Sequence, residues 1–203
     1  VELVSAARRG DPGSALDALR QHRLLCAHRD GPAGVEAWND RIEEWLTAAL
    51  PGAGAAGPWY AGRPAMVTTN DYGLRLFNGD TGVVVATGAE DRSVPDRSMV
   101  TDRLAVAFAG PESSFRMVSP YRLPAVETVF ATTVHTSQGS EFDRVTLILP
   151  AEGSRLLTRE LLYTAVTRAR REVLVVGGEA EVRRAVEHPL ARASGLGRRL
   201  WGL

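Results

Sequence analysis

Apolar runs alternate with helical patterns through the last third of the chain. The runs at 128–134, 145–149 and 173–176 are rich in β-branched residues, which is typical of buried strands. Helical periodicity at 158–171 follows the second run, and a closing helical pattern at 179–187 follows the third. Because strands that alternate with helices form parallel sheets, this order predicts an α/β fold.

The first third of the chain has the same texture. Residues 1–22 carry a weak helical pattern, 24–27 form a short apolar run, and 35–50 form an amphipathic helical pattern. The last of these puts Trp38 and Trp45 on its apolar side, and we expect both tryptophans to lie in the core.

Short strands and turns fill the middle of the chain. Asn78-Gly79 is a strong hairpin signal between two of the strand-like runs, and the polar tract at 88–102 is expected to be a loop. The five predicted strands, which indicate a small β-barrel, are 65–69, 74–77, 81–86, 104–109 and 115–118. We therefore predict one α/β domain formed by residues 1–60 and 125–203, with a β-barrel inserted at 61–124.

The composition excludes several classes of protein. All 24 basic residues are arginine and the net charge is zero, so the chain has no P-loop lysine and any nucleic-acid contact must be local. Cys26 is the single cysteine, which excludes an internal disulfide and suits a small buried residue. No secretion signal and no membrane span are visible, so we expect a cytoplasmic protein with no membrane contact.

A polar stretch at 131–142 separates two of the apolar runs. It contains Thr133 and His135 where a turn would begin, then Gly139, which allows close backbone approach, and Glu141, which can accept hydrogen bonds from sugar hydroxyls. If the turn opens a short helix, its free N–H groups attract phosphate. The alternative is an ordinary connection between strands.

Two arginines are further candidates for a ligand site. On the predicted helix at 158–171, Arg168 follows Thr164 by four residues, and its planar guanidinium can bind a γ-phosphate in bidentate fashion. The alternative is an ion pair with a neighbouring carboxylate. Arg29 follows a predicted strand end and could point into a ligand cleft, or it could be a solvated loop arginine.

These stretches resemble the motifs of superfamily 1 helicases. Residues 132–142 resemble motif V, 163–170 (Tyr-Thr-Ala-Val-Thr-Arg-Ala-Arg) resemble motif VI, and 27–39 look like the motif IV region. Within the superfamily the chain is most similar to the RecD family, the alpha subunits of exodeoxyribonuclease V. That resemblance runs through nearly the whole chain and rests further on the stretches 77–80, 139–143, 147–150 and 157–163.

The resemblance implies a fold and a function. The chain would be the C-terminal motor half of an ATP-dependent 5′-to-3′ DNA helicase that acts in double-strand break repair and recombination. Its α/β domain would be the RecA-like domain 2A and its insertion an SH3-like domain 2B. ATP with Mg²⁺ would bind between this half and a half that carries the P-loop, and the partners would be single-stranded DNA and subunits of the RecB and RecC type.

The resemblance also implies roles for single residues. Arg168 would be the catalytic arginine on the γ-phosphate, Gly139 and Glu141 would approach phosphate and ribose, and Arg29 is a weaker ATP-binding candidate. Thr133 and His135 would contact the DNA backbone, but Thr136 stands where relatives usually carry lysine. The alternatives are a stand-alone RecD-like helicase and a non-catalytic DNA-binding or assembly module.

Overall fold

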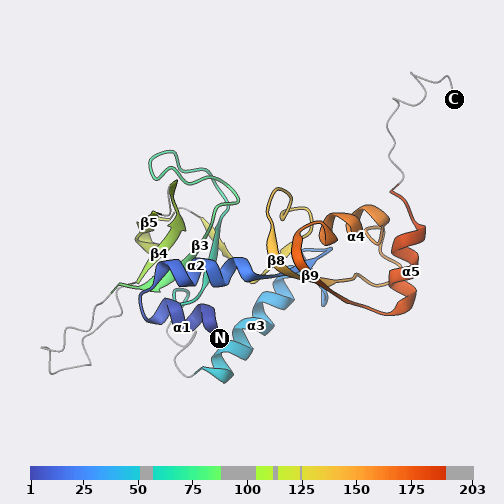
Figure 1. The fold of residues 1–203 in the computed structure, drawn as a ribbon, viewed down its shortest axis with the longest axis horizontal. Helices are drawn as coiled ribbons and strands as arrows, with labels where there is room; N and C mark the ends of the chain where they lie inside the picture. Colours follow the sequence, from blue (N-terminus) through green and yellow to red (C-terminus); the bar gives the residue numbers. More distant parts are fainter. Residues whose placement is uncertain (51–56, 88–103, 112–113, 124, 191–203) are drawn as a thin grey trace, which may run out of the picture.

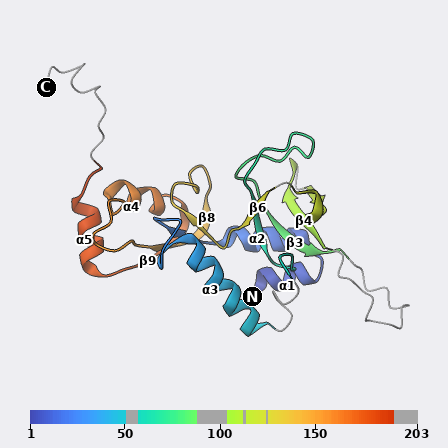
Figure 2. The same ribbon diagram turned by 180° about the vertical axis from the view of Figure 1, so that it is seen from behind.

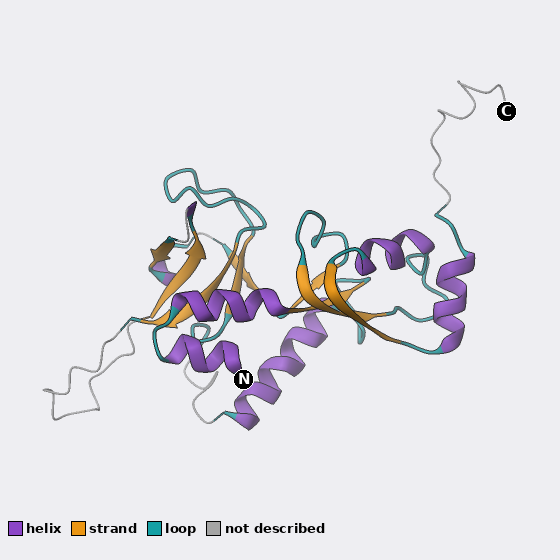
Figure 3. Ribbon diagram, viewed as in Figure 1, coloured by secondary structure: helices purple, strands orange, loops and turns teal. Residues whose placement is uncertain are grey.

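The computed structural model describes residues 1–50, 57–87, 104–111, 114–123 and 125–190. The molecule is elongated and has two lobes, each built on its own sheet (Figure 1). Figure 3 shows the two sheets in orange, one in each lobe. We call them the parallel lobe and the antiparallel lobe.

The parallel lobe contains a four-stranded sheet in the order β7-β1-β8-β9, in which every neighbouring pair is parallel. This confirms the predicted α/β fold with a parallel sheet. Strand β1 lies in the centre because its apolar side chains are buried on both faces. The strands are β1 (His22–Cys26), β7 (Ala131–Thr133), β8 (Phe142–Ile148) and β9 (Ala169–Val176).

Helices cover both faces of this sheet. Helices α4 (Arg159–Val166) and α5 (Glu179–Glu187) pack over one face, around a buried cluster that includes Leu25 and Leu147. Helix α3 (Val35–Ala49) lies on the other face. The side chain of Asn39 fixes α3 to the sheet, since its amide donates to Thr128 O (3.0 Å) and accepts from Ala131 N–H (2.8 Å). From there α3 runs towards α1 and the N-terminus (Figure 2).

The antiparallel lobe contains a five-stranded sheet in the order β5-β4-β3-β2-β6. Its strands are β2 (Pro64–Val67), β3 (Thr81–Ala86), β4 (Leu104–Ala109), β5 (Phe115–Val118) and β6 (Val126–Thr128), and a short 3₁₀ helix, η3, spans Pro120–Arg122. Four of the five predicted strands are therefore present. The predicted strand at 74–77 is wrong, because that segment contributes only an isolated bridge between Asp71 and Leu76. The predicted loop at 88–102 lies outside the described residues.

The contacts between elements cross the predicted domain boundaries. Helices α1 (Glu2–Arg8) and α2 (Pro12–Gln21) were expected to join the parallel lobe, but they pack on β3 through a cluster that includes Ala7 and Val83. Strand β6 begins after residue 125, yet it pairs with β2. Small alanine side chains on α1 and α2 allow this close approach to the sheet.

Two further expectations about helices are wrong. The helix predicted at 158–171 ends at Val166, and Ala169 already pairs with Phe142 as the first residue of β9. The β-branched residues that follow favour the strand, and parallel pairing with β8 fixes it. In α3, Trp45 remains 59% exposed instead of lying in the core, although it makes an edge contact with Trp38 (centroids 6.1 Å apart).

Cys26 is fully buried, as expected of a small apolar residue, and burial raises the pKa of its thiol to about 12. Within the described part of the chain, none of the helices has the length and apolar character needed to span a membrane.

Candidate functional site

The connection from β7 to β8 carries most of the predicted site residues. It leaves β7 beside the carboxyl end of β1, since Thr133 pairs with Cys26. It then crosses to the other end of the parallel strands and enters β8 beside the amino end of β1. The predicted order of strand, polar turn and strand is confirmed. The connection contains turns and no helix, so the predicted helix N-terminus for phosphate is absent from it.

Side-chain hydrogen bonds hold the first half of this connection. Thr133 Oγ1 accepts from Thr136 N–H (3.0 Å) and lies 2.8 Å from Thr136 Oγ1. The buried Ser137 hydroxyl donates to Val134 O (2.8 Å). His135 lies between these pairs and its side chain is exposed. The backbone here is therefore fixed from within, which leaves the imidazole directed at solvent.

The second half of the connection presents backbone and a carboxylate. Gly139 has φ +86°, and a Cβ placed there would meet no atom within 4 Å, so this residue borders open space. Glu141 is exposed and accepts from Arg170 Nε at 3.0 Å. Because both partners are more than half exposed, this ion pair orients Glu141 but contributes little to stability.

Arg168 joins this connection to the end of α4. Its backbone carbonyl accepts from Phe142 N–H (2.8 Å), which places the starts of β8 and β9 side by side. Its guanidinium donates to Thr164 O, Ser140 O and Thr167 Oγ1, each at 3.2 Å. None of these acceptors is charged, and no carboxylate among the described residues forms an ion pair with Arg168. The alternative of a paired structural arginine is thus not what the structure contains.

Arg29 has a different environment. Its guanidinium donates to Glu127 Oε1 at 2.6 Å and lies 3.5 Å from Glu36 Oε1. The hydrogen bond to Glu127 and the nearby negative charges raise the pKa of Arg29. Two carboxylates thus already compensate this cation, which weakens the expectation that it binds nucleotide.

The structure therefore brings only some of the candidates together. Gly139, Glu141 and Arg168 gather at the end of the sheet where β8 and β9 begin. Thr133 lies at the other end, where β7 and β1 finish, and Arg29 follows the end of β1. Sequence reasoning missed Arg170, because it was assigned to a helix. Arg170 is the second residue of β9, two positions after Arg168, and its guanidinium reaches Glu141 on the same connection.

The motifs that meet in this region match a known domain. Residues 128–176, which include the whole connection and β9, match the model of the UvrD-like helicase C-terminal domain. The solved structure of a Pif1 helicase from Candida albicans is similar over 98% of this chain and 57% of its own length, with a TM-score of 0.54 and 15% identity. That likeness supports the fold alone.

Two relatives are similar in sequence. The RecBCD enzyme subunit RecD of Mycolicibacterium smegmatis is 52% identical over 98% of this chain, and the ATP-dependent RecD2 DNA helicase of Deinococcus radiodurans is 32% identical over 79% of it. The chain spans about a third of the length of the first and a fifth of the second. The predicted resemblance to RecD is therefore confirmed.

Proposed function

Because the chain resembles RecD along nearly its whole length, we propose that it is the second motor half of an ATP-dependent DNA helicase subunit. In this proposal the parallel lobe is the RecA-like domain 2A, and the antiparallel lobe, centred on residues 61–124, is the inserted SH3-like domain 2B. The enzyme moves 5′ to 3′ on single-stranded DNA in the cytoplasm, with subunits of the RecB and RecC type, in the repair of double-strand breaks by recombination. The observation that carries the proposal is 52% identity over 98% of the chain.

In this motor half, Arg168 acts on the γ-phosphate of ATP. Its guanidinium already lies at the meeting point of the two motifs, held by three neutral oxygen acceptors that it can exchange for phosphate oxygens. A planar guanidinium stabilises the charge that spreads over the phosphoryl group during transfer. Gly139 lets the backbone approach a phosphate, and Glu141 accepts from a ribose hydroxyl once it turns from Arg170.

The rest of the nucleotide site comes from a P-loop half. Without lysine this chain cannot supply the P-loop ammonium. No group of three or more acidic, histidine or cysteine side chains in the described ranges is arranged to hold a metal ion. Mg²⁺ would then be bound by the triphosphate and by the P-loop half, while this chain contributes the arginine and the backbone near Gly139.

Thr133 and His135 form the DNA side of the same connection. They lie at the opposite end from Arg168, so one segment of backbone links the DNA contact to the nucleotide contact. Closing of the two halves around ATP would shift that segment and move the strand, because contacts to the DNA backbone do not depend on base sequence. Thr136, which is paired with Thr133, adds no charge to this contact.

The second candidate is a stand-alone RecD-like helicase that needs no partner subunits. Identity of 52% to a RecBCD subunit, against 32% to RecD2, favours the subunit. A non-catalytic DNA-binding or assembly module is the third candidate. The half-buried Arg168 guanidinium, which forms no ion pair with a carboxylate in the described part of the chain, argues against it, since such a module needs no cation there.

The test compares three preparations: the 203-residue chain, the intact protein and the intact protein carrying His135→Ala. Steady-state ATPase activity is measured with single-stranded DNA, and DNA and nucleotide affinities are measured separately. We expect no turnover from the 203-residue chain, DNA-stimulated turnover from the intact protein, and selective loss of DNA affinity in the intact protein carrying His135→Ala. Nucleotide affinity measured without DNA should be unchanged in that variant. Turnover by the isolated chain, or equal loss of ATP and DNA binding, would contradict the proposal.

A further inference from the structure

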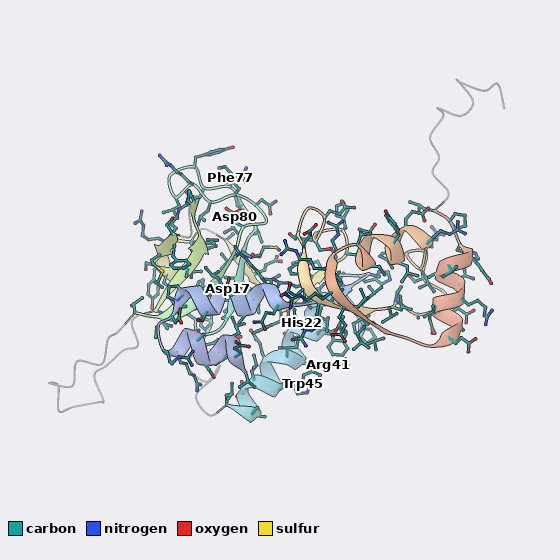
Figure 4. The ribbon with its side chains drawn as sticks, in the orientation of Figure 1. Asp17, His22, Arg41, Trp45, Phe77 and Asp80 are labelled. Carbon is teal, nitrogen blue, oxygen red and sulfur yellow. The ribbon has the colours of Figure 1, made fainter. Side chains whose placement is uncertain are left out.

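A buried arginine lies at the start of the central strand of the parallel lobe. Arg23 is the second residue of β1 and is only 3% exposed. His22, which precedes it, is labelled in Figure 4 where α2 meets β1. Arg23 pairs with Val145 of β8, so its side chain lies on the face of the sheet that α4 and α5 cover. The proposed motor function assigns it no role so far.

Two contacts fix the guanidinium of Arg23. It donates to the backbone carbonyl of Val129, and its central carbon lies 4.9 Å from the centroid of the Phe142 ring. Its Nε is buried and has no hydrogen-bond partner within the part of the chain that the structure describes. The side chain thus reaches from the segment that links the two sheets to the first residue of β8.

This environment is a poor one for a residue whose role is to stabilise the fold. Burial lowers the pKa of Arg23 to about 10, because the charged guanidinium loses its hydration. Apolar side chains of similar volume can often replace buried ionic groups without loss of stability. The contacts of the guanidinium therefore indicate a role other than stability.

The Phe142 contact lies next to the candidate nucleotide site. The N–H of Phe142 donates to the backbone carbonyl of Arg168 at 2.8 Å. Two residues earlier, Ser140 O accepts from the Arg168 guanidinium at 3.2 Å. Glu141, which lies between them, accepts from Arg170. A displacement of the Phe142 ring would therefore disturb the backbone contact of Arg168 and one contact of its side chain.

The Val129 contact lies in the short link between β6 and β7. Val129 is 3% exposed, and its N–H donates to Pro64 O, at the start of β2, at 3.1 Å. The carbonyl that accepts from Arg23 therefore belongs to a residue that is itself fixed to the antiparallel lobe. Arg23 thus holds the start of β8 against a buried, anchored point of the chain.

We propose that Arg23 is a positioning residue for ATP hydrolysis: through Phe142 it holds Arg168 where its guanidinium can meet the γ-phosphate. The inference rests on the proposed function, in which Arg168 acts on that phosphate. Arg23 itself is buried and acts only through its neighbours. A group that acts in the transition state needs accurate placement, since a displacement of about 1 Å can lower a rate by about 10²-fold.

Steady-state ATPase kinetics of the intact protein with single-stranded DNA provide the first test. Arg23→Met should lower kcat at least tenfold and change the KM for ATP less than twofold, because Arg168 acts mainly in the transition state. In a protein that already carries Arg168→Ala, Arg23→Met should change kcat less than twofold, since the group to be positioned is gone. Wild-type kcat after Arg23→Met, or losses that multiply in the double variant, would contradict the inference.

The matched control is Arg20→Met. It removes an arginine three residues earlier in the chain, on α2, whose side chain is 64% exposed. Because Arg20 contacts neither Phe142 nor Val129, its removal should leave turnover unchanged. An equal loss of turnover in the two variants would overturn a specific role for Arg23.

Hydrogen exchange of backbone amides gives a readout that does not depend on turnover. Arg23→Met should accelerate exchange of the Phe142 amide at least tenfold. The Leu149 amide, which donates to Val176 O at the other end of the same strand pair, should be unchanged. Equal acceleration at both amides would indicate a general loss of stability and overturn the inference.

A second variant keeps the inference testable if Arg23→Met impairs folding. Phe142→Leu removes the aromatic ring and leaves Arg23 in place, so it should give the same selective exchange and the same loss of kcat. Wild-type turnover and exchange in this variant would overturn the inference.

The failures of the two proposals are distinguishable. Loss of turnover after Arg168→Ala, together with wild-type turnover and exchange after Arg23→Met, would retain the role of Arg168 and overturn the positioning role. Near-normal turnover after Arg168→Ala would overturn the assignment of Arg168 to the γ-phosphate and, with it, the role of Arg23 in hydrolysis.

Discussion

The two sheets differ in how completely this chain covers them. In the antiparallel lobe, the central residues of β3 and β4 are buried throughout, because α1 and α2 pack on one face and a second apolar cluster fills the other. In the parallel lobe, β9 is largely exposed, with Leu174 at 56% and Val176 at 42%. Parallel sheets are normally buried on both faces. The central strands of the antiparallel lobe are thus covered by this chain itself, whereas the parallel lobe carries the functional loops beside an exposed β9.

The largest expected difference in stability is between a substitution on the buried face of the parallel sheet and one on its exposed face. Leu147 is fully buried in β8 among the residues that face α4 and α5, so Leu147→Ala should lower the free energy of unfolding by about 2–5 kcal/mol. Leu174→Ala, on the exposed face of β9, is the matched control and should change it by less than about 0.5 kcal/mol. Urea denaturation measures both, and equal losses would mean that the Leu174 face is covered.

The next effect tests how α1 docks on the antiparallel lobe. Gly62 has φ +95°, and a Cβ there would lie 2.7 Å from Val4 Cγ2 and 2.9 Å from Val4 Cα. Gly62→Ala should therefore cost roughly 1–3 kcal/mol. Gly153→Ala, where a Cβ meets nothing within 4 Å, should be close to neutral. If the two variants have the same thermal midpoint, the close packing of α1 is not as described.

A smaller effect concerns the helix that leads to Arg168. Thr158 caps α4, and its Oγ1 accepts from Leu161 N–H at 3.3 Å. Thr158→Ala should cost about 1 kcal/mol, and Thr158→Ser, which retains the hydroxyl, much less. The comparison by chemical denaturation would go against this assignment if serine and alanine were equally destabilising.

The smallest effect is a dependence on pH at the start of β1. Burial, then the positive charges of Arg144 and Arg23, lower the pKa of His22 below its usual 6.5. The unfolded chain therefore binds a proton more readily than the folded one, and stability should fall as the pH drops through the usual value towards the folded pKa. His22→Gln should flatten that part of the profile of stability against pH. An unchanged profile would mean that His22 is not the titrating group.

The local elements could be predicted from sequence because their signals are local. The runs at 24–27 and 81–86 and the amphipathic pattern at 35–50 correspond to β1, β3 and α3. The end of α4 could not be predicted in this way. Apolar spacing continues past Val166, and only pairing of β9 with β8 decides in favour of a strand.

The sequence does not predict which surfaces are covered or which site residues meet, because both depend on tertiary structure. The pattern of α3 shows that Trp45 lies on an apolar side, but it contains no information about what covers that side. The contact of Arg168 with Ser140 joins residues 28 positions apart in sequence, and the motifs indicate it only through the resemblance to helicases. The buried charge of Arg23 has no periodic signal, since an arginine within a strand is ordinarily expected at the surface.

The assignment of Arg168 to the γ-phosphate is tested most directly by steady-state ATPase activity of the intact enzyme. Arg168→Ala should lower kcat by roughly 10³-fold or more, because the guanidinium acts mainly as charge spreads in the transition state. Arg168→Lys should restore little, since an ammonium lacks the planar fork. Thermal unfolding of the same proteins should change only slightly, because the arginine is half-exposed. Near-normal turnover, or a loss of stability large enough to account for the lost activity, would contradict the assignment.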